Sequence, residues 1–464
     1  MKSAIAFVKD FEVFSSILRE LKRYNLNLKS VSTADDAIEA AKEEDNPLIF
    51  LDLRSIHVDP EVDGLIKRLA ENEIEGVSVV VISGRHIPKW CAAEADLIAS
   101  CFVQFRSNGE LVELRGGSLH LVISGESRKT IPVIHRLEGT DVNLQTREPK
   151  FFQAIDDIRR IAHRNVTILI VGETGTGKTT LARIIHERSP RRDRPFQNLA
   201  CGALPSDIIE SELFGHTRGA FTGADRNKMG RFQAAGQGTL LLDEIDVLDV
   251  KQQAKLLKVI ETGEYEMVGS TEPRRAEARL IVASNVNLEV MAEASKFRSD
   301  LYYRLSVLEF RLLPLRERVD DIIPLAMQFV HECCLEHEIE IDSVDFDFLD
   351  VLRDYHWPGN IRELKNHIRR AVLFCENGKL TVNDLSPKLV QSQFEPSPIA
   401  MELKQKTSLA EQVAQNEREL LVQALNANDN NRTKTAKALG ISRVGLYKKL
   451  RKHGLVETQT TEVG

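Results

Sequence analysis

Residues 166–171 read Val-Thr-Ile-Leu-Ile-Val and run directly into Gly172-Glu-Thr-Gly-Thr-Gly-Lys-Thr179, the junction that decides the fold of the middle of the chain. The apolar run predicts a buried parallel strand, and the next eight residues fit the pattern G-x-x-x-x-G-K-[ST] ahead of a helical stretch. Backbone N–H groups of such a loop wrap phosphates, its lysine reaches the outer phosphates, and its threonine offers a hydroxyl to Mg²⁺. A plain glycine turn is the alternative, which the flanking elements disfavour. We therefore predict binding of ATP and Mg²⁺ at Gly172, Glu173, Thr174, Gly175, Thr176, Gly177, Lys178, Thr179 and Thr180.

Two later apolar runs end in polar residues that fit the same site. A Leu-Leu-Leu run precedes Asp243 and Glu244, and Asn285 follows residues 280–284. Ligands of parallel sheets bind at the carboxyl ends of the strands, so we expect Asp243 to help hold Mg²⁺ and Glu244 to act as general base. The Asn285 amide can orient the water or sense the terminal phosphate. An acidic helix cap and a turn asparagine are the structural alternatives.

Residues 297–305 carry two arginines six positions apart, Arg298 and Arg304. An arginine supplied by a neighbouring subunit stabilises the charge that develops on a transferred phosphoryl group. If these arginines act in that way, the active site is an interface and the working unit is a ring. Two solvated, ion-paired arginines are the alternative.

Residues 219–224 read Gly-Ala-Phe-Thr-Gly-Ala and lie between the phosphate loop and the Asp-Glu pair. Gly219 and Gly223 give the backbone freedom at a tip, and Phe221 and Thr222 have no local core to join. We expect this loop to point outward and to contact another molecule. The residues are Gly219, Ala220, Phe221, Thr222, Gly223 and Ala224.

The composition bounds the class of protein. A chain of 464 residues with 42% apolar and 28% charged residues predicts a multidomain globular protein, and it has no run of 18 apolar residues and no signal-peptide pattern. We therefore expect a cytoplasmic protein without membrane segments. The six cysteines lack zinc-type spacing and are expected to be reduced. The net charge is -7, but residues 430–456 hold eight basic and no acidic residues, which indicates a small basic module on an acidic body.

The predicted fold class is α/β multidomain. The first part alternates short apolar runs with helical patterns, as in a doubly wound parallel sheet, and a hairpin and a broken helix are both open around residues 108–117. After Pro314 the chain becomes helical. The predicted domains are 1–124, a receiver-like domain; 125–147, a linker; 148–313, an α/β ATPase core; 314–385, a helical lid; 386–410, a linker; and 411–464, an all-α helix-turn-helix.

Taken together, these segments resemble the bacterial enhancer-binding proteins, the AAA+ activators of sigma-54 RNA polymerase. The shared segments are residues 210–216, 219–224, 238–245, 297–305, 315–318 and 357–364, and the resemblance extends over the whole central part, about half of the chain. It implies an AAA+ fold, a hexamer assembled from dimers, and contact between residues 219–224 and sigma-54 RNA polymerase. It also implies that Arg298 and Arg304 act in trans and that Arg362 senses nucleotide from the lid.

Two positions depart from the family pattern. Thr179 stands where the family usually has an acidic residue, which moves the loop toward the general phosphate-loop pattern. Ala200 stands where the family has an asparagine that restrains the catalytic glutamate. Asn198, two residues earlier and on the same strand face, is a possible substitute.

Residues 430–455 resemble the Fis-type helix-turn-helix of these activators, which implies that upstream activating DNA is a partner. Residues 433–439 predict one helix, Gly440 permits a turn, and Ser442 caps the next helix. A solvated basic tail is the alternative. The predicted DNA contacts are Arg432, Lys434, Ser442, Arg443, Tyr447, Lys448 and Lys449.

The first domain resembles a response-regulator receiver with altered chemistry, of the kind found in two-component systems. Asp52 follows an apolar run as a phosphoacceptor does, and Ser83 follows the next run. However, Lys9-Asp10 replaces the usual acidic pair, and residues 97–105 hold no lysine. Losing a carboxylate weakens metal binding, so we expect a sensing or assembly role more than phosphorylation.

The sequence thus predicts an ATP-hydrolysing transcription activator. A DNA-binding regulator that binds ATP without productive hydrolysis is the second hypothesis, which Ala200 keeps open. An AAA+ unfoldase is the third, and the basic module together with the lack of a substrate-threading pore motif disfavours it.

Overall fold

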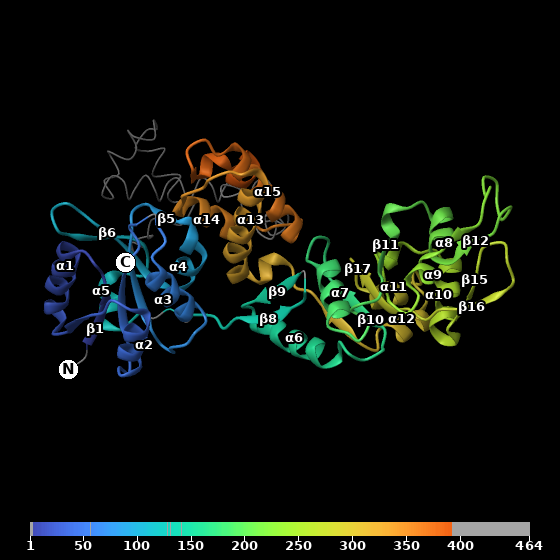
Figure 1. Cartoon of the computed structure of the whole chain (residues 1–464), viewed down its shortest axis with the longest axis horizontal. Helices are drawn as coiled ribbons and strands as arrows, with labels where there is room; N and C mark the ends of the chain where they lie inside the picture. The colour runs from blue at the N-terminus through green and yellow to red at the C-terminus, as the bar shows by residue number, and fades with distance from the viewer. Residues whose placement is uncertain (1–2, 56, 128, 130, 141, 392–464) are drawn as a thin grey trace, which may run out of the picture. The chain divides into compact units, whose positions relative to one another are not determined.

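The computed structural model describes residues 3–391 except 56, 128, 130 and 141, and it has the predicted α/β multidomain character (Figure 1). The predicted helix-turn-helix and all but the first residues of the second linker lie outside the described residues. Among the helices described, none is long and apolar enough to cross a membrane.

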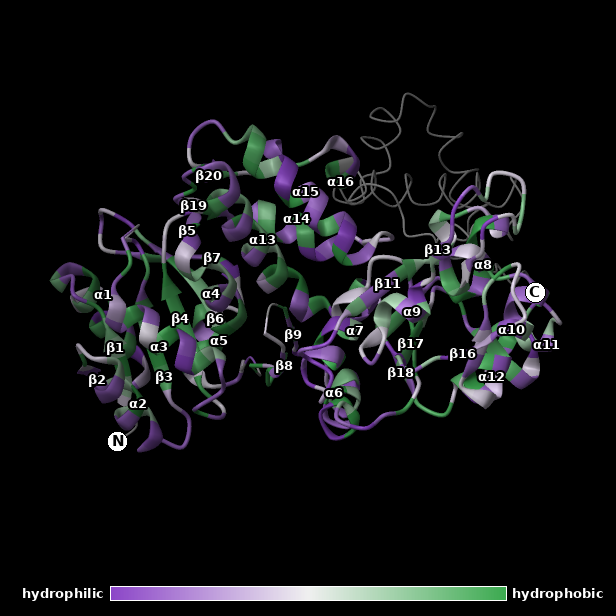
Figure 2. Ribbon diagram, turned by 45° about the vertical axis from the view of Figure 1, so that its right-hand side comes forward, coloured by the Kyte–Doolittle hydropathy of each residue, from purple (hydrophilic) through white to green (hydrophobic). Residues whose placement is uncertain are grey.

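The receiver-like domain is a doubly wound sheet of order β2-β1-β3-β4-β6-β7, in which only β7 is antiparallel. Helices α1 and α5 pack on one face and α2, α3 and α4 on the other, because alternate strand residues are apolar on both faces. The strands β3 and β4 are accordingly hydrophobic in Figure 2. The elements are β1 (Ser3–Phe7), α1 (Phe11–Leu21), β2 (Asn27–Ser30), α2 (Ala34–Lys42), β3 (Leu48–Asp52), α3 (Pro60–Ala70), β4 (Ser78–Ile82), α4 (Ala92–Ile98), β6 (Ala99–Phe105), β7 (Leu111–Gly116) and α5 (Leu119–Ser124).

A hairpin forms where the sequence left a hairpin and a broken helix open. Strands β6 and β7 pair antiparallel around a turn at Gly109, whose φ is 80°. Gly116 has φ 92°, and a Cβ there would lie 2.8 Å from the Ser100 carbonyl oxygen. Both glycines therefore have a conformational reason to be glycine.

The segment predicted as the first linker, residues 125–147, contains the hairpin of β8 (His135–Glu138) and β9 (Asn143–Thr146). The last residues of this segment, Thr146 and Arg147, are hydrogen-bonded to the buried carboxylate of Asp321 near the start of the lid. Asp321 accepts hydrogen bonds from the Thr146 hydroxyl at 2.6 Å and from the Arg147 amide at 2.7 Å. Burial raises the pKa of Asp321, and these hydrogen bonds oppose that rise.

The ATPase core is a parallel sheet of order β11-β14-β17-β10-β18. Helices α6 and α7 cover one face, and α8, α9, α10 and α12 cover the other, each through its own apolar cluster. All strands point the same way, so their carboxyl ends form one edge. The elements are α6 (Pro149–Ile161), β10 (Ile168–Val171), α7 (Lys178–Glu187), β11 (Phe196–Ala200), α8 (Ser206–Phe214), α9 (Arg231–Ala235), β14 (Thr239–Asp243), α10 (Val250–Thr262), β17 (Arg279–Ser284), α11 (Leu288–Glu293), α12 (Ser299–Leu305) and β18 (Glu309–Arg311).

The lid is helical, as predicted after Pro314, and it shares a sheet with the receiver-like domain. Strand β19 pairs with β20 on one side and with β5, a strand of the receiver-like domain, on the other. The apolar residues of both domains form one continuous cluster, in which the Phe102 and Phe346 rings meet edge to face at 4.8 Å. The elements are β5 (His86–Pro88), α13 (Ile322–His337), β19 (Ser343–Asp345), α14 (Phe346–Asp354), α15 (Asn360–Phe374), β20 (Lys379–Leu380) and α16 (Pro387–Gln391).

Four charged residues join the same two domains. The Asp96 carboxylate, 6% exposed, pairs with Arg115 at 2.7 Å and with Arg353 of the lid. Arg115 also pairs with Asp350 of the lid. We call these residues the Asp96 network. A buried charge needs partners, and Asp96 finds Arg115 in its own domain but meets Arg353 only while the two domains are in contact.

Candidate nucleotide site and exposed loop

The phosphate loop joins β10 to α7, as predicted. Gly175 and Gly177 have φ of 81° and 104°, conformations that other residues rarely adopt. Lys178 is buried, and its ammonium donates to the Gly172 carbonyl at 2.7 Å, the Glu173 carbonyl at 3.0 Å and the Asn285 side-chain oxygen at 2.6 Å. Burial lowers the pKa of Lys178, and the carboxylates of Asp243 and Glu244 oppose that shift. The charge is thus held by carbonyls at the mouth of the loop.

The carboxyl edge of the sheet brings the predicted polar residues together. The Thr179 hydroxyl lies 3.2 Å from Asp243 Oδ2, and the Asn285 amide donates to Glu244 Oε1 at 3.2 Å. Asn285 therefore touches both Lys178 and Glu244, one through each end of its amide. Glu244 has φ 58°, an uncommon value for this residue type, and such strain is frequent at functional sites.

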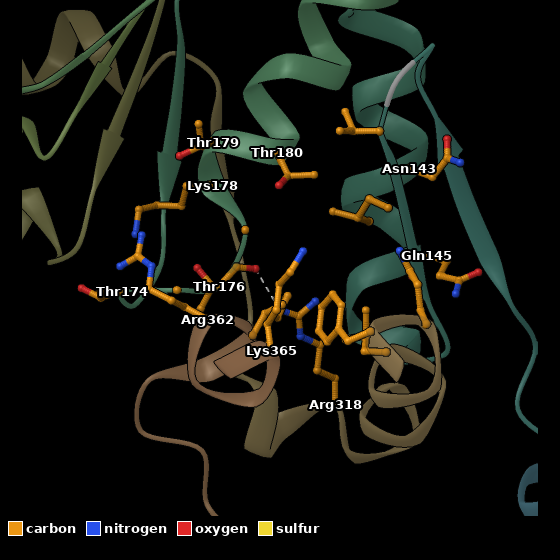
Figure 3. Close-up of a pocket in the computed structure, with 18 of the residues that line it drawn as sticks. Asn143, Gln145, Thr174, Thr176, Lys178, Thr179, Thr180, Arg318, Arg362 and Lys365 are labelled. Carbon is orange, nitrogen blue, oxygen red and sulfur yellow. Dashed lines mark hydrogen bonds between the residues drawn. The ribbon is translucent and has the colours of Figure 1, made fainter. Parts of the chain in front are cut away.

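A cavity of about 670 Å³ opens over these residues and is lined by the loop, the hairpin β8-β9 and the lid (Figure 3). Arg362 and Lys365 reach it from α15, and Arg318 lies below Thr176 (Figure 3). From the predicted set, the lining contains Thr174, Gly175, Thr176, Gly177, Lys178, Thr179, Thr180, Asp243, Glu244, Asn285 and Arg362. Gly172 and Glu173 are not in the lining but hold Lys178.

The lid is hydrogen-bonded to the phosphate loop through residues that the sequence did not single out as site residues. Asn360 donates to the Thr174 carbonyl at 3.1 Å, and the Ile361 amide donates to the Gly175 carbonyl at 3.0 Å. Arg318, 3% exposed, donates to the Thr176 carbonyl at 3.0 Å. The segments 315–318 and 357–364 carried part of the family resemblance, so a signal was present.

Arg298 and Arg304 do not line the cavity of their own chain. Arg298 is the N-cap of α12 and pairs with Asp300 at 2.6 Å, and Arg304 pairs with Glu261 at 3.3 Å. Both side chains are exposed or nearly so. Their exposure leaves them accessible to another molecule.

Residues 219–223 form a largely exposed tip between β12 (Gly215–His216) and β13 (Lys228–Met229). Ala220 is partly buried and Ala224 is only 5% exposed, so not all of the segment 219–224 points outward as predicted. Gly219 and Gly223 have φ of 83° and 96°, and a Cβ at either would meet open space. The Phe221 ring is 47% exposed and meets His216 edge to face at 4.9 Å. The ring is therefore not wholly without a local partner, which the sequence did not predict.

The position of Ala200 bears on the catalytic glutamate. Ala200 ends β11 beside Asp243, and the carboxylate of Glu244 lies against Gly202. Within the described part of the chain, no hydrogen bond joins Glu244 to Asn198, and its side-chain donor is Asn285. In this structure, Asn198 therefore does not replace the family's asparagine as a hydrogen-bond donor to Glu244.

Three segments match known families. Residues 144–311 match the Sigma-54 interaction domain, residues 316–400 the AAA+ ATPase lid domain, and residues 412–453 the bacterial regulatory proteins of the Fis family. The regulatory protein AtoC of Escherichia coli (strain K12) is 34% identical over 413 residues, which cover 88% of this chain and 88% of AtoC. The chain belongs to the sigma-54-dependent AAA+ activators. It is an ATP-dependent transcriptional activator and an AAA+ ATPase.

One further relative and one solved structure align with nearly the whole activator. The regulatory protein LuxO of Vibrio cholerae is 32% identical over 451 residues, covering 96% of this chain and 97% of LuxO. The crystal structure of NtrX from Brucella abortus in complex with ATP has a TM-score of 0.50 at 23% identity, covering 98% of this chain and 99% of NtrX. At that identity the likeness shows the fold alone. The predicted DNA contacts lie outside the described residues but inside the Fis-family match.

Proposed function

We propose that this activator hydrolyses ATP with Mg²⁺ held by Thr179 and Asp243. The two side-chain oxygens converge within 3.2 Å at the carboxyl edge, and oxygen ligands are those that Mg²⁺ prefers. When bound, Mg²⁺ would neutralise phosphate charge. Lys178 binds the outer phosphates, Arg362 senses nucleotide from the lid, and the Glu244 carboxylate accepts a proton from the attacking water, positioned by Asn285.

The assembly that we propose is a homo-oligomer, dimers that form a hexameric ring. Arg298 and Arg304 support this, because they are charged, accessible and absent from their own cavity. Each pairs with an exposed carboxylate, and exposed ion pairs cost little to break. In the ring, they would reach the nucleotide of the adjacent subunit.

The partners that we propose are sigma-54 RNA polymerase, contacted by residues 219–224, and upstream activating DNA, bound by the basic module. This role places the activator in the cytoplasm. The observation that carries the proposal is the pairing of a complete phosphate-loop site with an exposed tip in one ATPase core. Nucleotide-driven movement of that tip would remodel the polymerase.

Transcription from a sigma-54 promoter in vitro tests this function. We expect Thr222→Ala to keep its ATPase rate and to lose most promoter opening, because Thr222 lies at the tip and not in the cavity. The matched control is Thr140→Ala, another exposed threonine, which should behave as wild type. Equal output from Thr222→Ala and wild type, or no output from wild type, would contradict the proposal.

A further inference from the structure

The two carboxylates Asp10 and Asp52 of the receiver-like domain, which we call the acidic pair, share a cation supplied by the chain itself. Asp52 ends β3, and Arg54 folds back over it: Nε donates to Asp52 Oδ1 at 2.9 Å and Nη2 to Asp52 Oδ2 at 2.7 Å. The same Nη2 donates to Asp10 Oδ2 at 2.9 Å. One guanidinium therefore bridges Asp10 and Asp52, the two carboxylates that this domain retains from the Mg²⁺-binding set of a receiver.

The remaining oxygen of Asp10 is also engaged. Asp10 is the N-cap of α1, and its Oδ1 accepts from the Glu12 amide at 2.9 Å and the Val13 amide at 3.3 Å. All four carboxylate oxygens of Asp10 and Asp52 thus accept hydrogen bonds from the protein. A divalent ion would have to displace both a bidentate arginine contact and a helix cap.

The surroundings favour the arginine over a bound metal. The Arg54 guanidinium carbon lies 5.5 Å from the centre of the Phe105 ring. Phe105 ends β6, and residues 97–105 contain no lysine that could approach the two carboxylates from this strand. Lys9, next to Asp10, points to a different partner and pairs with Asp59. The Arg54 hydrogen bond is also the main reason why the pKa of Asp10 is lowered.

We propose that Arg54 is the resident counter-ion of this acidic pair, so that the receiver-like domain holds Asp10 and Asp52 together without a divalent ion and without phosphorylation. In a phosphorylatable receiver, an aspartate oxygen attacks phosphorus and displaces the leaving group, and a metal ion neutralises the phosphoryl oxygens. Here the attacking oxygens are hydrogen-bonded to Arg54, and the metal position is filled by its charge. The acidic pair and Arg54 together form a structural ion-pair site.

Mn²⁺ titration of the nucleotide-free full chain tests the proposal. Wild type should show no Mn²⁺ binding that depends on Asp10. We expect Arg54→Gln to gain an Asp10-dependent Mn²⁺ site that wild type lacks, because the freed carboxylates become ligands. The double variant Asp10→Asn/Arg54→Gln should lose that gain, which distinguishes Mn²⁺ bound at the acidic pair from Mn²⁺ bound at the nucleotide site.

A second measurement uses wild type alone, so it does not depend on how a variant folds. Acetyl phosphate with Mg²⁺ would transfer its phosphoryl group to an Asp52 oxygen and release acetate, and intact mass would detect the adduct. We expect no adduct that is lost in Asp52→Asn. An Asp52-dependent adduct on wild type, Asp10-dependent Mn²⁺ binding by wild type, or no gain of Mn²⁺ binding in a folded Arg54→Gln variant would each overturn the proposal.

Discussion

Replacing Asp96 by alanine should loosen the contact between the receiver-like domain and the lid. The change leaves Arg115 and Arg353, whose side chains are 17% and 31% exposed, without their shared carboxylate. Removing one partner of a buried ion pair costs about 3–5 kcal/mol, and partial exposure reduces this to about 2–3 kcal/mol. Asp350, which still pairs with both arginines, limits the loss.

Urea unfolding followed by tryptophan fluorescence measures this effect, because both tryptophans of the chain report on the shared cluster. Trp357 is fully buried in it and Trp90 packs against it. With a denaturant dependence of about 2–3 kcal/mol per molar urea, the midpoint of the transition should fall by about 1 M. In wild type, the tryptophan fluorescence should change in a single unfolding transition, because Trp90 and Trp357 belong to the same cluster.

Asp35→Ala is the matched control for this experiment. The Asp35 side chain is 92% exposed and pairs with Arg68 at 2.7 Å, so its loss should cost less than about 0.5 kcal/mol. If Asp96→Ala shifted the midpoint no more than Asp35→Ala, the Asp96 network would not stabilise the contact. Two separate wild-type transitions would likewise refute a shared cooperative unit.

Two further changes test the catalytic edge. Asn285→Ala removes the contacts to Lys178 and Glu244 and should lower kcat about 10- to 100-fold with a smaller change in KM. The control variant Asn287→Ala removes only the N-cap of α11 and should keep kcat. Equal rates for the two variants would contradict the role of Asn285. Gly202→Ala places a Cβ against the Glu244 carboxylate and should lower the ATPase rate while nucleotide binding persists, so an unchanged rate would show that Glu244 tolerates displacement.

Most of the ATPase core could be predicted because its signals are local. The junction of β10 with the glycine-rich loop, and the apolar runs that end at Asp243 and Asn285, each combine a short buried strand with a polar residue at its end. Parallel order then brings these ends together without further information. The close contacts of Asn285 with Lys178 and Glu244 follow from that geometry.

The elements that were missed depend on contacts between distant residues. Strand β5 spans three residues and β20 two, too few to show any periodicity, and each forms only because β19 lies beside it. Arg318 contacts Thr176 across 142 positions of sequence. The sequence did not single out Arg54, because its role depends on contacts to both Asp52, two residues away, and Asp10, 44 residues away.

The pairing of β5 in the receiver-like domain with β19 in the lid limits how deletion experiments on this activator can be interpreted. Cutting away residues 1–124 removes β5, so β19 becomes an open edge, and the apolar side chains of the lid that it helped to cover meet water. A shortened protein is then prone to aggregate through these newly exposed apolar side chains. Altered activity after such a cut reports damage to the lid as much as loss of a regulatory input, and point changes at the surface are the cleaner genetic tool.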